Sequence, residues 1–298
     1  MLEGLYFWKK KSGTTSLLQV MGWLLIMIVL SGGAGAGYWY YFIKLPADEM
    51  KAQQQQAAQQ LRKDIDSVQD WYAKSLEGVS IDSALRLLDE IHRSILSLSL
   101  IRLPAEDLGY NCSMKLCSMH FELQSGAILT QPSLTFFGKT YLASFPVGKG
   151  KNKKDALSLE YKDMKFSIPN HDGLKAYKAN KPLELPACND VISYIKTYNS
   201  VIASGKSRKK NGEIVFKSLP KSPVGDLEKR LTGQVKSYGM LSSDWSIEVS
   251  GTGGQYGSSK FLAQLALYKQ AYRDAFLIRK IETVKDGIKI SGGLVCKA

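Results

Sequence analysis

The chain has 298 residues, 44% of them hydrophobic, and carries a formal net charge of +13 at pH 7. That hydrophobic share is ordinary for a globular protein, so the chain can bury a real core and has room for a membrane segment and one or two small domains. The basic residues gather at 149–154 and 206–221, without the interleaved aromatic residues of a nucleic-acid platform. We therefore expect no nucleic-acid partner. A solvated face, or a contact with anionic lipid or an acidic partner, is the simpler interpretation.

An uncharged stretch near the N-terminus predicts a transmembrane helix. No Asp, Glu, Lys or Arg lies between Lys11 and Lys44, and the centre of this stretch is apolar. About 20 mostly apolar residues suffice to cross the hydrocarbon core of a bilayer, so we predict a spanning helix over residues 17–43. Aromatic residues at 6–8 and 38–42 would lie at the two interfaces, where amphipathic rings are favoured.

The charges beside this stretch predict its orientation. The lysines at 9–11 lie in a short tail, residues 1–16, and basic residues favour the cytoplasmic side. We therefore predict a single-pass protein of the bacterial inner membrane, with a cytoplasmic N-terminus and a periplasmic remainder. A cleaved signal peptide is the alternative, because residues 34–36 have the small side chains of a cleavage site. The apolar stretch continues to Ile43, which favours a retained anchor.

Two patterns predict pairing with another helix. Gly33 and Gly37 form a Gly-x-x-x-Gly pair, which allows close approach of a second membrane helix. Residues 47–79 then form a Gln- and Ala-rich stalk, a composition that favours helix. Its recurring apolar positions are Ala58, Leu61, Ile65, Val68, Tyr72 and Val79. This narrow heptad seam predicts a coiled-coil contact with one partner helix that continues the glycine face outside the membrane. A helix packed on its own domain is the alternative.

A first α+β region is predicted over residues 80–204. It begins with an amphipathic helix at residues 81–100, whose wide apolar stripe favours packing on a sheet. The further elements are strands at 119–123, 134–141 and 157–168 and a helix at 191–203 that Asp190 can cap.

A second region, residues 205–298, follows a basic loop and is predicted to be a ferredoxin-like α/β sandwich. Its elements are a strand at 213–217, a helix at 223–238, a strand at 245–250, a helix at 260–271 and strands at 276–284 and 288–295. Asp286 and Gly287, between the last two strands, are a good hairpin signal. The first region is a candidate degenerate copy of this order, although no residue-level repeat is visible.

The cysteines predict disulfides. All four lie beyond the predicted span, and an even number in an oxidising compartment indicates two bridges. Cys112 and Cys117 are close enough in sequence to close a tight loop, which leaves Cys188 with Cys296. Four cysteines allow three connectivities, so the other two pairings stay open.

No motif predicts catalysis or a cofactor. The glycine-rich residues 251–257 lie between a predicted strand and a predicted helix, but Tyr256 occupies a position where a dinucleotide fingerprint needs glycine. Neither His-Glu-x-x-His nor Gly-x-Ser-x-Gly occurs, and the three histidines are scattered. We therefore predict a non-catalytic protein without metal or cofactor.

The order of tail, span, stalk and α+β exterior resembles the PilO-like bitopic proteins of type IV pilus and type II secretion machines. Likeness at the level of residues is confined to the C-terminal end, which looks like the last ferredoxin-like unit of the type IVb branch. The residues that carry it are Trp245-Ser246-Ile247-Glu248-Val249-Ser250-Gly251, Leu262, Leu265 and Leu267, Phe276-Leu277-Ile278, and Gly287-Ile288-Lys289-Ile290-Ser291-Gly292-Gly293-Leu294.

The resemblance implies a scaffold. A PilO-like chain pairs with a bitopic partner as a homodimer or heterodimer, and the pair links the cytoplasmic ATPase ring and the platform protein to the outer-membrane secretin. The tail, residues 1–16, would then face the cytoplasmic ring. Residues 58–79 would hold the stalk partner, with Leu61, Ile65, Val68 and Tyr72 as the contact residues. Two alternatives stay open. One is an inner-membrane component of a type IV secretion channel, for which we expect one curved sheet and no long stalk helix; the other is a membrane-anchored periplasmic binding protein.

Overall fold

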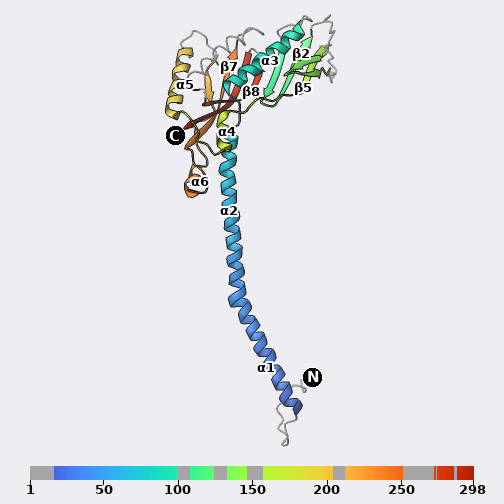
Figure 1. The fold of residues 1–298 in the computed structure, drawn as a ribbon, viewed down its shortest axis with the longest axis vertical. Helices are drawn as coiled ribbons and strands as arrows, with labels where there is room; N and C mark the ends of the chain where they lie inside the picture. The colour runs from blue at the N-terminus through green and yellow to red at the C-terminus, as the bar shows by residue number, and fades with distance from the viewer. Residues whose placement is uncertain are drawn as a thin grey trace, which may run out of the picture. The chain divides into compact units, whose positions relative to one another are not determined.

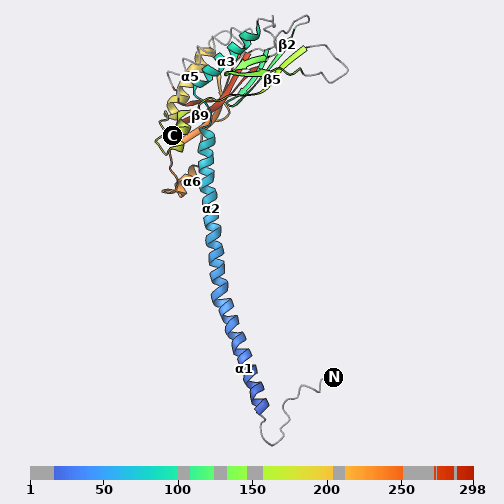
Figure 2. The same ribbon diagram turned by 45° about the vertical axis from the view of Figure 1, so that its right-hand side comes forward.

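The computed structural model describes residues 17–99, 108–123, 133–145, 157–203, 212–250, 272, 274–284 and 287–298. The contacts between residues divide the chain into two compact units, Met1–Asp64 and Ile65–Ala298. Figures 1 and 2 show the described helices and strands in two views.

The first unit is helical throughout its described part. Helix α1 spans Leu17–Tyr38 and a π-helical segment, η2, follows at Trp39–Lys44. Helix α2, Leu45–Ser75, begins in this unit and ends in the second. Among the described residues one helix is long and apolar enough to cross a membrane; it is this N-terminal one, and its apolar window is not buried by the chain. The structure thus contains one candidate transmembrane helix, where the sequence predicts one.

The second unit is built on an antiparallel sheet of seven strands in the order β5-β2-β1-β8-β9-β7-β6. These strands are β1 Leu108–Ser113, β2 Leu116–Leu123, β5 Leu157–Lys165, β6 Ile214–Phe216, β7 Met240–Ser250, β8 Phe276–Val284 and β9 Gly287–Lys297. A separate hairpin consists of β3 Ser133–Phe136 and β4 Lys139–Leu142. Besides the end of α2, the described residues of this unit form the helices α3 Ile81–Ser99, α4 Asp172–Lys178, α5 Cys188–Ala203 and α6 Gly225–Arg230.

Two apolar clusters lie on the two faces of the large sheet, because successive strand residues point to opposite faces. Ile247 and Ile290, which are paired across β7 and β9, belong to the cluster that includes α3 and α5. Figure 2 shows these two helices on the same side of the strands. Leu277 and Val295 belong to the second cluster, together with the end of α2 and Leu174 of α4. The last turns of α2 are therefore part of the core of the second unit.

The predicted division at residue 205 is corrected by the structure. Strand β1, which precedes that boundary, pairs with β8, which follows it, at Asn111↔Glu282 and two further positions. Residues 65–298 make one unit around one large sheet, and its described elements do not separate into ferredoxin-like copies. Sequence alone did not reveal this pairing, because contact between strands far apart in the chain leaves no periodic signal in either strand.

Two predicted elements in the described part have a different form. The expected strand at 134–141 is the hairpin β3–β4, because Phe137 and Gly138 have φ of 47° and 72°, the positive values that the two central residues of a type I′ turn require. The expected helix at 223–238 is reduced to α6, which ends at Arg230. Beyond it Gly233 has a φ of 87°, which is incompatible with a continued right-handed helix.

The other helices and strands predicted in the described part are present, with bounds that differ by up to five residues. Helix α3 begins at the predicted residue, β8 has the predicted bounds, and β8 and β9 pair as the predicted hairpin. Helix α5 begins earlier than expected, so that Asp190 lies in its first turn instead of capping it. Strand β1 and helix α4 were not expected. The glycine-rich residues 251–257 and the predicted helix at 260–271 lie outside the described residues.

Candidate functional site

The predicted pairing face of the membrane helix is open in this chain. Gly33 and Gly37 lie on α1, and a Cβ atom built at either would meet no other atom within 4 Å. Neighbouring apolar side chains of the same helix, such as Leu30, are more than half exposed. Pairing through this face stays a prediction.

The π-helical segment η2 rotates the two predicted pairing faces relative to each other. The Leu45 N–H donates to the Tyr40 carbonyl five residues back, which is the bond pattern of a π-helix. One extra residue per turn rotates the downstream faces by about 100° relative to a continuous α-helix. The two glycines and the seam residues Ala58 and Leu61 would lie about 70° apart in a continuous α-helix, and the extra residue increases this to about 170°. Ideal helix geometry with this π-helical turn thus argues against one continuous face, because it places the glycines and the seam on opposite sides.

The seam itself divides into an exposed and a buried part. Leu61 is 37% exposed, whereas Val68 and Tyr72 are 1% and 0% exposed. Both buried residues, with Ile65 packed against them, belong to the apolar cluster on the α4 side of the large sheet. Val68 and Tyr72 were predicted to hold a partner helix; they pack on their own domain instead, which was the alternative interpretation of the same periodicity. Among the seam residues, only those before Ile65 are exposed enough to contact a partner helix.

Tyr72 fixes α2 to the second unit through its hydroxyl group. The hydroxyl donates to the Glu228 carboxylate of α6 and accepts the backbone N–H of Tyr238 at 3.1 Å. Its ring stacks on Tyr177 with ring centroids 5.2 Å apart. Burial raises the pKa of Tyr72 well above its ordinary value, and the bond to the nearby carboxylate adds to this. The phenol therefore stays protonated and keeps its donor.

Arg279 of β8 caps the end of helix α2. Its Nε donates to the Glu77 carbonyl at 2.9 Å, and its Nη2 donates to the carbonyls of Lys74 and Ser75, both at 3.0 Å. The last carbonyls of a helix have no partner within the helix, and a planar guanidinium group can bind several of them at once. Its Nη1 donates to Asp244 Oδ1 of β7 at 3.0 Å. We call these contacts the Arg279 joint.

A glycine makes room for this joint. A Cβ atom built at Gly293 of β9 would lie 2.6 Å from Nη2 and 2.9 Å from Cζ of Arg279. The guanidinium group therefore lies directly against the backbone of β9. Any larger residue at position 293 would displace it.

The chain leaves α2 through a tight connection into the centre of the sheet. Gly78 has a φ of 147°, and a Cβ atom there would lie 3.0 Å from Leu277 Cβ. The next residue, Val79, exchanges two backbone hydrogen bonds with Ile278 of β8, at 2.9 and 3.0 Å. The Gly78 carbonyl accepts the backbone N–H of His171 at 3.0 Å, which ties the start of α4 to the same point.

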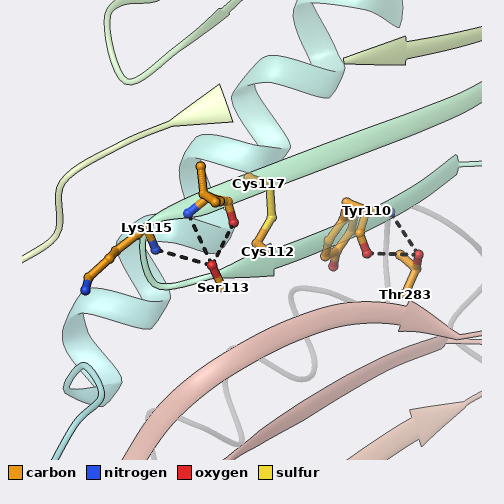
Figure 3. Close-up of a disulfide and its surroundings, with 7 residues drawn as sticks. Tyr110, Cys112, Ser113, Lys115, Cys117 and Thr283 are labelled. Carbon is orange, nitrogen blue, oxygen red and sulfur yellow. Dashed lines mark hydrogen bonds between the residues drawn. A yellow bond between two sulfur atoms is a disulfide. The ribbon is translucent and has the colours of Figure 1, made fainter. Parts of the chain in front are cut away.

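Both disulfides have the connectivity favoured from the sequence. Cys112 and Cys117 are paired across the β1–β2 hairpin (Figure 3), and Cys188 of α5 is bonded to Cys296 of β9. In Figure 3 the Ser113 hydroxyl faces the turn of the hairpin, where it accepts the Leu116 N–H at 3.2 Å. The hairpin turn is therefore held by a side-chain hydrogen bond as well as by the bridge.

A shallow hollow over β1, β2, β5 and the end of β8 is a candidate for a small-molecule site in the described part of the second unit. Its lining includes His120, Glu160 and Lys162. The Glu160 carboxylate lies 2.6 Å from Lys162 Nζ and 3.5 Å from His120 Nδ1. The lysine hydrogen bond lowers the pKa of Glu160, against the opposing effect of burial. Glu160 and Lys162 therefore form an ion pair in the lining of the hollow.

The described residues hold no group of three or more His, Cys, Asp or Glu side chains that could bind a metal ion. No family model matches this chain, and no match is found among curated proteins or among solved structures. Three features of the described residues are candidates for a functional role: an apolar helix that the chain does not bury, the exposed first part of α2, and the Arg279 joint at the end of α2.

Sequence reasoning missed the Arg279 joint. Arg279 lies more than 200 residues after the carbonyls that it caps. An arginine in a strand carries no local indication of such a role. Two adjacent glycines in β9, Gly292 and Gly293, were visible in the sequence, and glycine inside a strand often marks the close approach of another group.

Proposed function

We propose that this chain is a non-catalytic scaffold of the bacterial inner membrane that serves in type IVb pilus assembly. Its N-terminal tail faces the cytoplasm, α1 crosses the bilayer, and the disulfide-bonded second unit lies in the periplasm. It pairs with a similar bitopic protein and so connects the platform protein and the cytoplasmic ATPase ring with the outer-membrane secretin.

The observation that carries this proposal is helix α2. Its 31 residues follow a candidate membrane helix without a break, and its last turns are built into the core of a disulfide-bonded α+β unit. Such an element suits a protein that transmits position from the membrane to a periplasmic domain. Two disulfides support the periplasmic location, because bridges persist in oxidising compartments.

The exposed seam of α2 supports a helical partner. Leu61 and Met50 are 37% and 60% exposed, and the helix around them is rich in glutamine and alanine. A helix with so few apolar residues buries little by itself and gains from a second helix. The partner is therefore expected to contact α2 ahead of Ile65.

A type IV secretion channel is the second candidate function. The single seven-stranded sheet of the second unit favours it, since one continuous sheet was the expectation for that class. The long helix α2 favours the pilus assembly, and we rank it first for that reason.

Crosslinking in native membranes tests the partner contact. A cysteine replaces Leu61 on the seam or, as the matched control, Gln56 on the opposite side of the same exposed helix. The Leu61→Cys protein is expected to form a crosslinked species with itself or with a bitopic partner, and the control is expected to form little. Equal crosslinking at both positions, or none at either, would contradict the proposed pairing.

A piliation assay then tests the assembly itself. Leu61→Asp is expected to leave the chain anchored and folded, because this side chain lies ahead of the buried part of α2. We expect it to abolish surface pili and co-purification of the partner. Undiminished pili in a Leu61→Asp variant that no longer co-purifies with the partner would refute the pilus role without refuting the pairing.

A further inference from the structure

Three independent ties hold the end of α2, and all of them lie within the second unit. The Arg279 guanidinium group binds three carbonyls at the helix end. The Tyr72 hydroxyl, one turn earlier, is bonded to Glu228 and to the backbone of Tyr238. The residue after the connection, Val79, is bonded to β8 on both its N–H and its carbonyl.

These ties restrain different motions of the helix. The Val79 bonds hold the chain beside β8, and the Arg279 joint holds the last carbonyls of α2 against the backbone of β9. Bending at Gly78 would have to break the guanidinium bonds, since their acceptors lie on Lys74, Ser75 and Glu77, just before that glycine. The only glycine between α2 and α3 is therefore not free to act as a hinge, although its lack of a side chain would otherwise suit it to that role.

We propose that the Arg279 joint locks the last turn of α2 to strands β8 and β9, so that a rotation of α2 turns the sheet instead of bending the chain at Gly78. Asp244 fixes the orientation of the guanidinium group, and Gly293 provides the space for it. This coupling does not depend on which assembly the chain serves.

An ordinary helix cap would differ from such a lock in one respect. A cap stabilises the helix end, and lysine, which keeps the charge, replaces arginine there at small cost. The proposed lock requires the planar guanidinium group of arginine. The single ammonium group of a lysine cannot bind three carbonyls and a carboxylate in fixed directions. The Arg279→Lys variant therefore separates the two roles.

Spin-label distance measurements on the full chain in detergent test the lock. Labels are attached to cysteines that replace Gln69 on α2 and Glu248 on β7, both exposed positions of the second unit. The unmodified joint is expected to give a narrow distance distribution. Arg279→Lys is expected to widen it, and so is Gly293→Ala, which displaces the guanidinium group without changing any charge.

The matched control is Arg93→Lys, the same substitution in the exposed ion pair with Asp89 on α3. It is expected to leave the distribution unchanged. An unchanged width in Arg279→Lys and Gly293→Ala, or an equal widening in the control, would overturn the proposal.

Hydrogen exchange of the unmodified protein provides a test that needs no variant. The amides of Leu76 and Val79 are expected to exchange as slowly as those in the middle of β8 and β9. Exchange faster than the strands by about tenfold or more would show that the helix end opens locally, and would also overturn the proposal.

Discussion

Removing the disulfide between Cys188 and Cys296 should destabilise the second unit more than removing the one between Cys112 and Cys117. All four cysteines are buried, so the two losses differ chiefly in the length of chain that each bridge closes, with sequence separations of 108 and 5. Loop-closure entropy assigns ~4.8 kcal/mol to the longer loop and ~2.1 kcal/mol to the shorter one. The expected difference in the free energy of unfolding is therefore ~2.7 kcal/mol.

Equilibrium unfolding in urea measures this difference. The two variants, Cys188→Ala with Cys296→Ala and Cys112→Ala with Cys117→Ala, are compared in the full chain in detergent. Tryptophan fluorescence reports on the second unit because Trp245 is buried there against Phe276. Each variant is the control for the other, since each removes two buried sulfur atoms and one covalent bond.

Equal losses in the free energy of unfolding would refute this reasoning, because they would show that the restraint on the unfolded chain does not determine the stability that each disulfide adds. A larger loss for the Cys112–Cys117 pair would show that packing around the β1–β2 hairpin dominates instead. The comparison holds only if the slopes of free energy against urea agree, since a changed slope reports a changed unfolded state.

Three further predictions concern the second unit. Gly292→Ala should destabilise it by about 3 kcal/mol or more in urea, because the new Cβ would lie 1.7 Å from the Leu277 carbonyl oxygen, whereas Gly225→Ala, whose nearest contact would be 3.8 Å, should be nearly neutral. Tyr72→Phe should cost ~1–3 kcal/mol in the same assay, since it leaves a buried carboxylate and a backbone N–H unpaired. Burial raises the pKa of Tyr161 to about 12. In the unfolded chain the same phenol ionises near pH ~10. Its contribution to the free energy of unfolding is therefore complete below that pH and is lost as the pH rises towards the pKa of the folded protein. The urea midpoint should accordingly fall between these two pH values and stay constant below them.

The elements that sequence predicted well have strong local patterns. Strand β8 and the hairpin to β9 follow from alternating apolar residues around Asp286 and Gly287, and α3 follows from a wide apolar stripe. The β3–β4 hairpin was missed because its turn places a phenylalanine, Phe137, at positive φ, where glycine, asparagine or aspartate is normally expected.

Long-range features of the second unit could not be predicted in the same way. The periodicity of α2 showed which face is apolar but not what covers it, and Val68 and Tyr72 proved to be covered by their own domain. The Arg279 joint depends on a side chain and carbonyls more than 200 residues apart. The pairing of β1 with β8 likewise joins distant segments. No local pattern in either strand indicated it, and the boundary was therefore predicted at residue 205, between the two strands.

The burial of Val68 and Tyr72 also limits how the proposed partner can bind. Residues 47–64 provide about two and a half heptads, whereas a coiled coil that holds together by itself needs about three or four. The stalk contact therefore requires support from a second surface. The membrane face with Gly33 and Gly37 cannot supply it to the same helix, since the π-helical turn places that face about 170° away. Two different neighbours, one in the membrane and one along α2, would satisfy both faces of the proposed assembly. Deletion of one residue from η2 should therefore reduce co-purification of the proposed partner while the urea midpoint of the second unit stays unchanged.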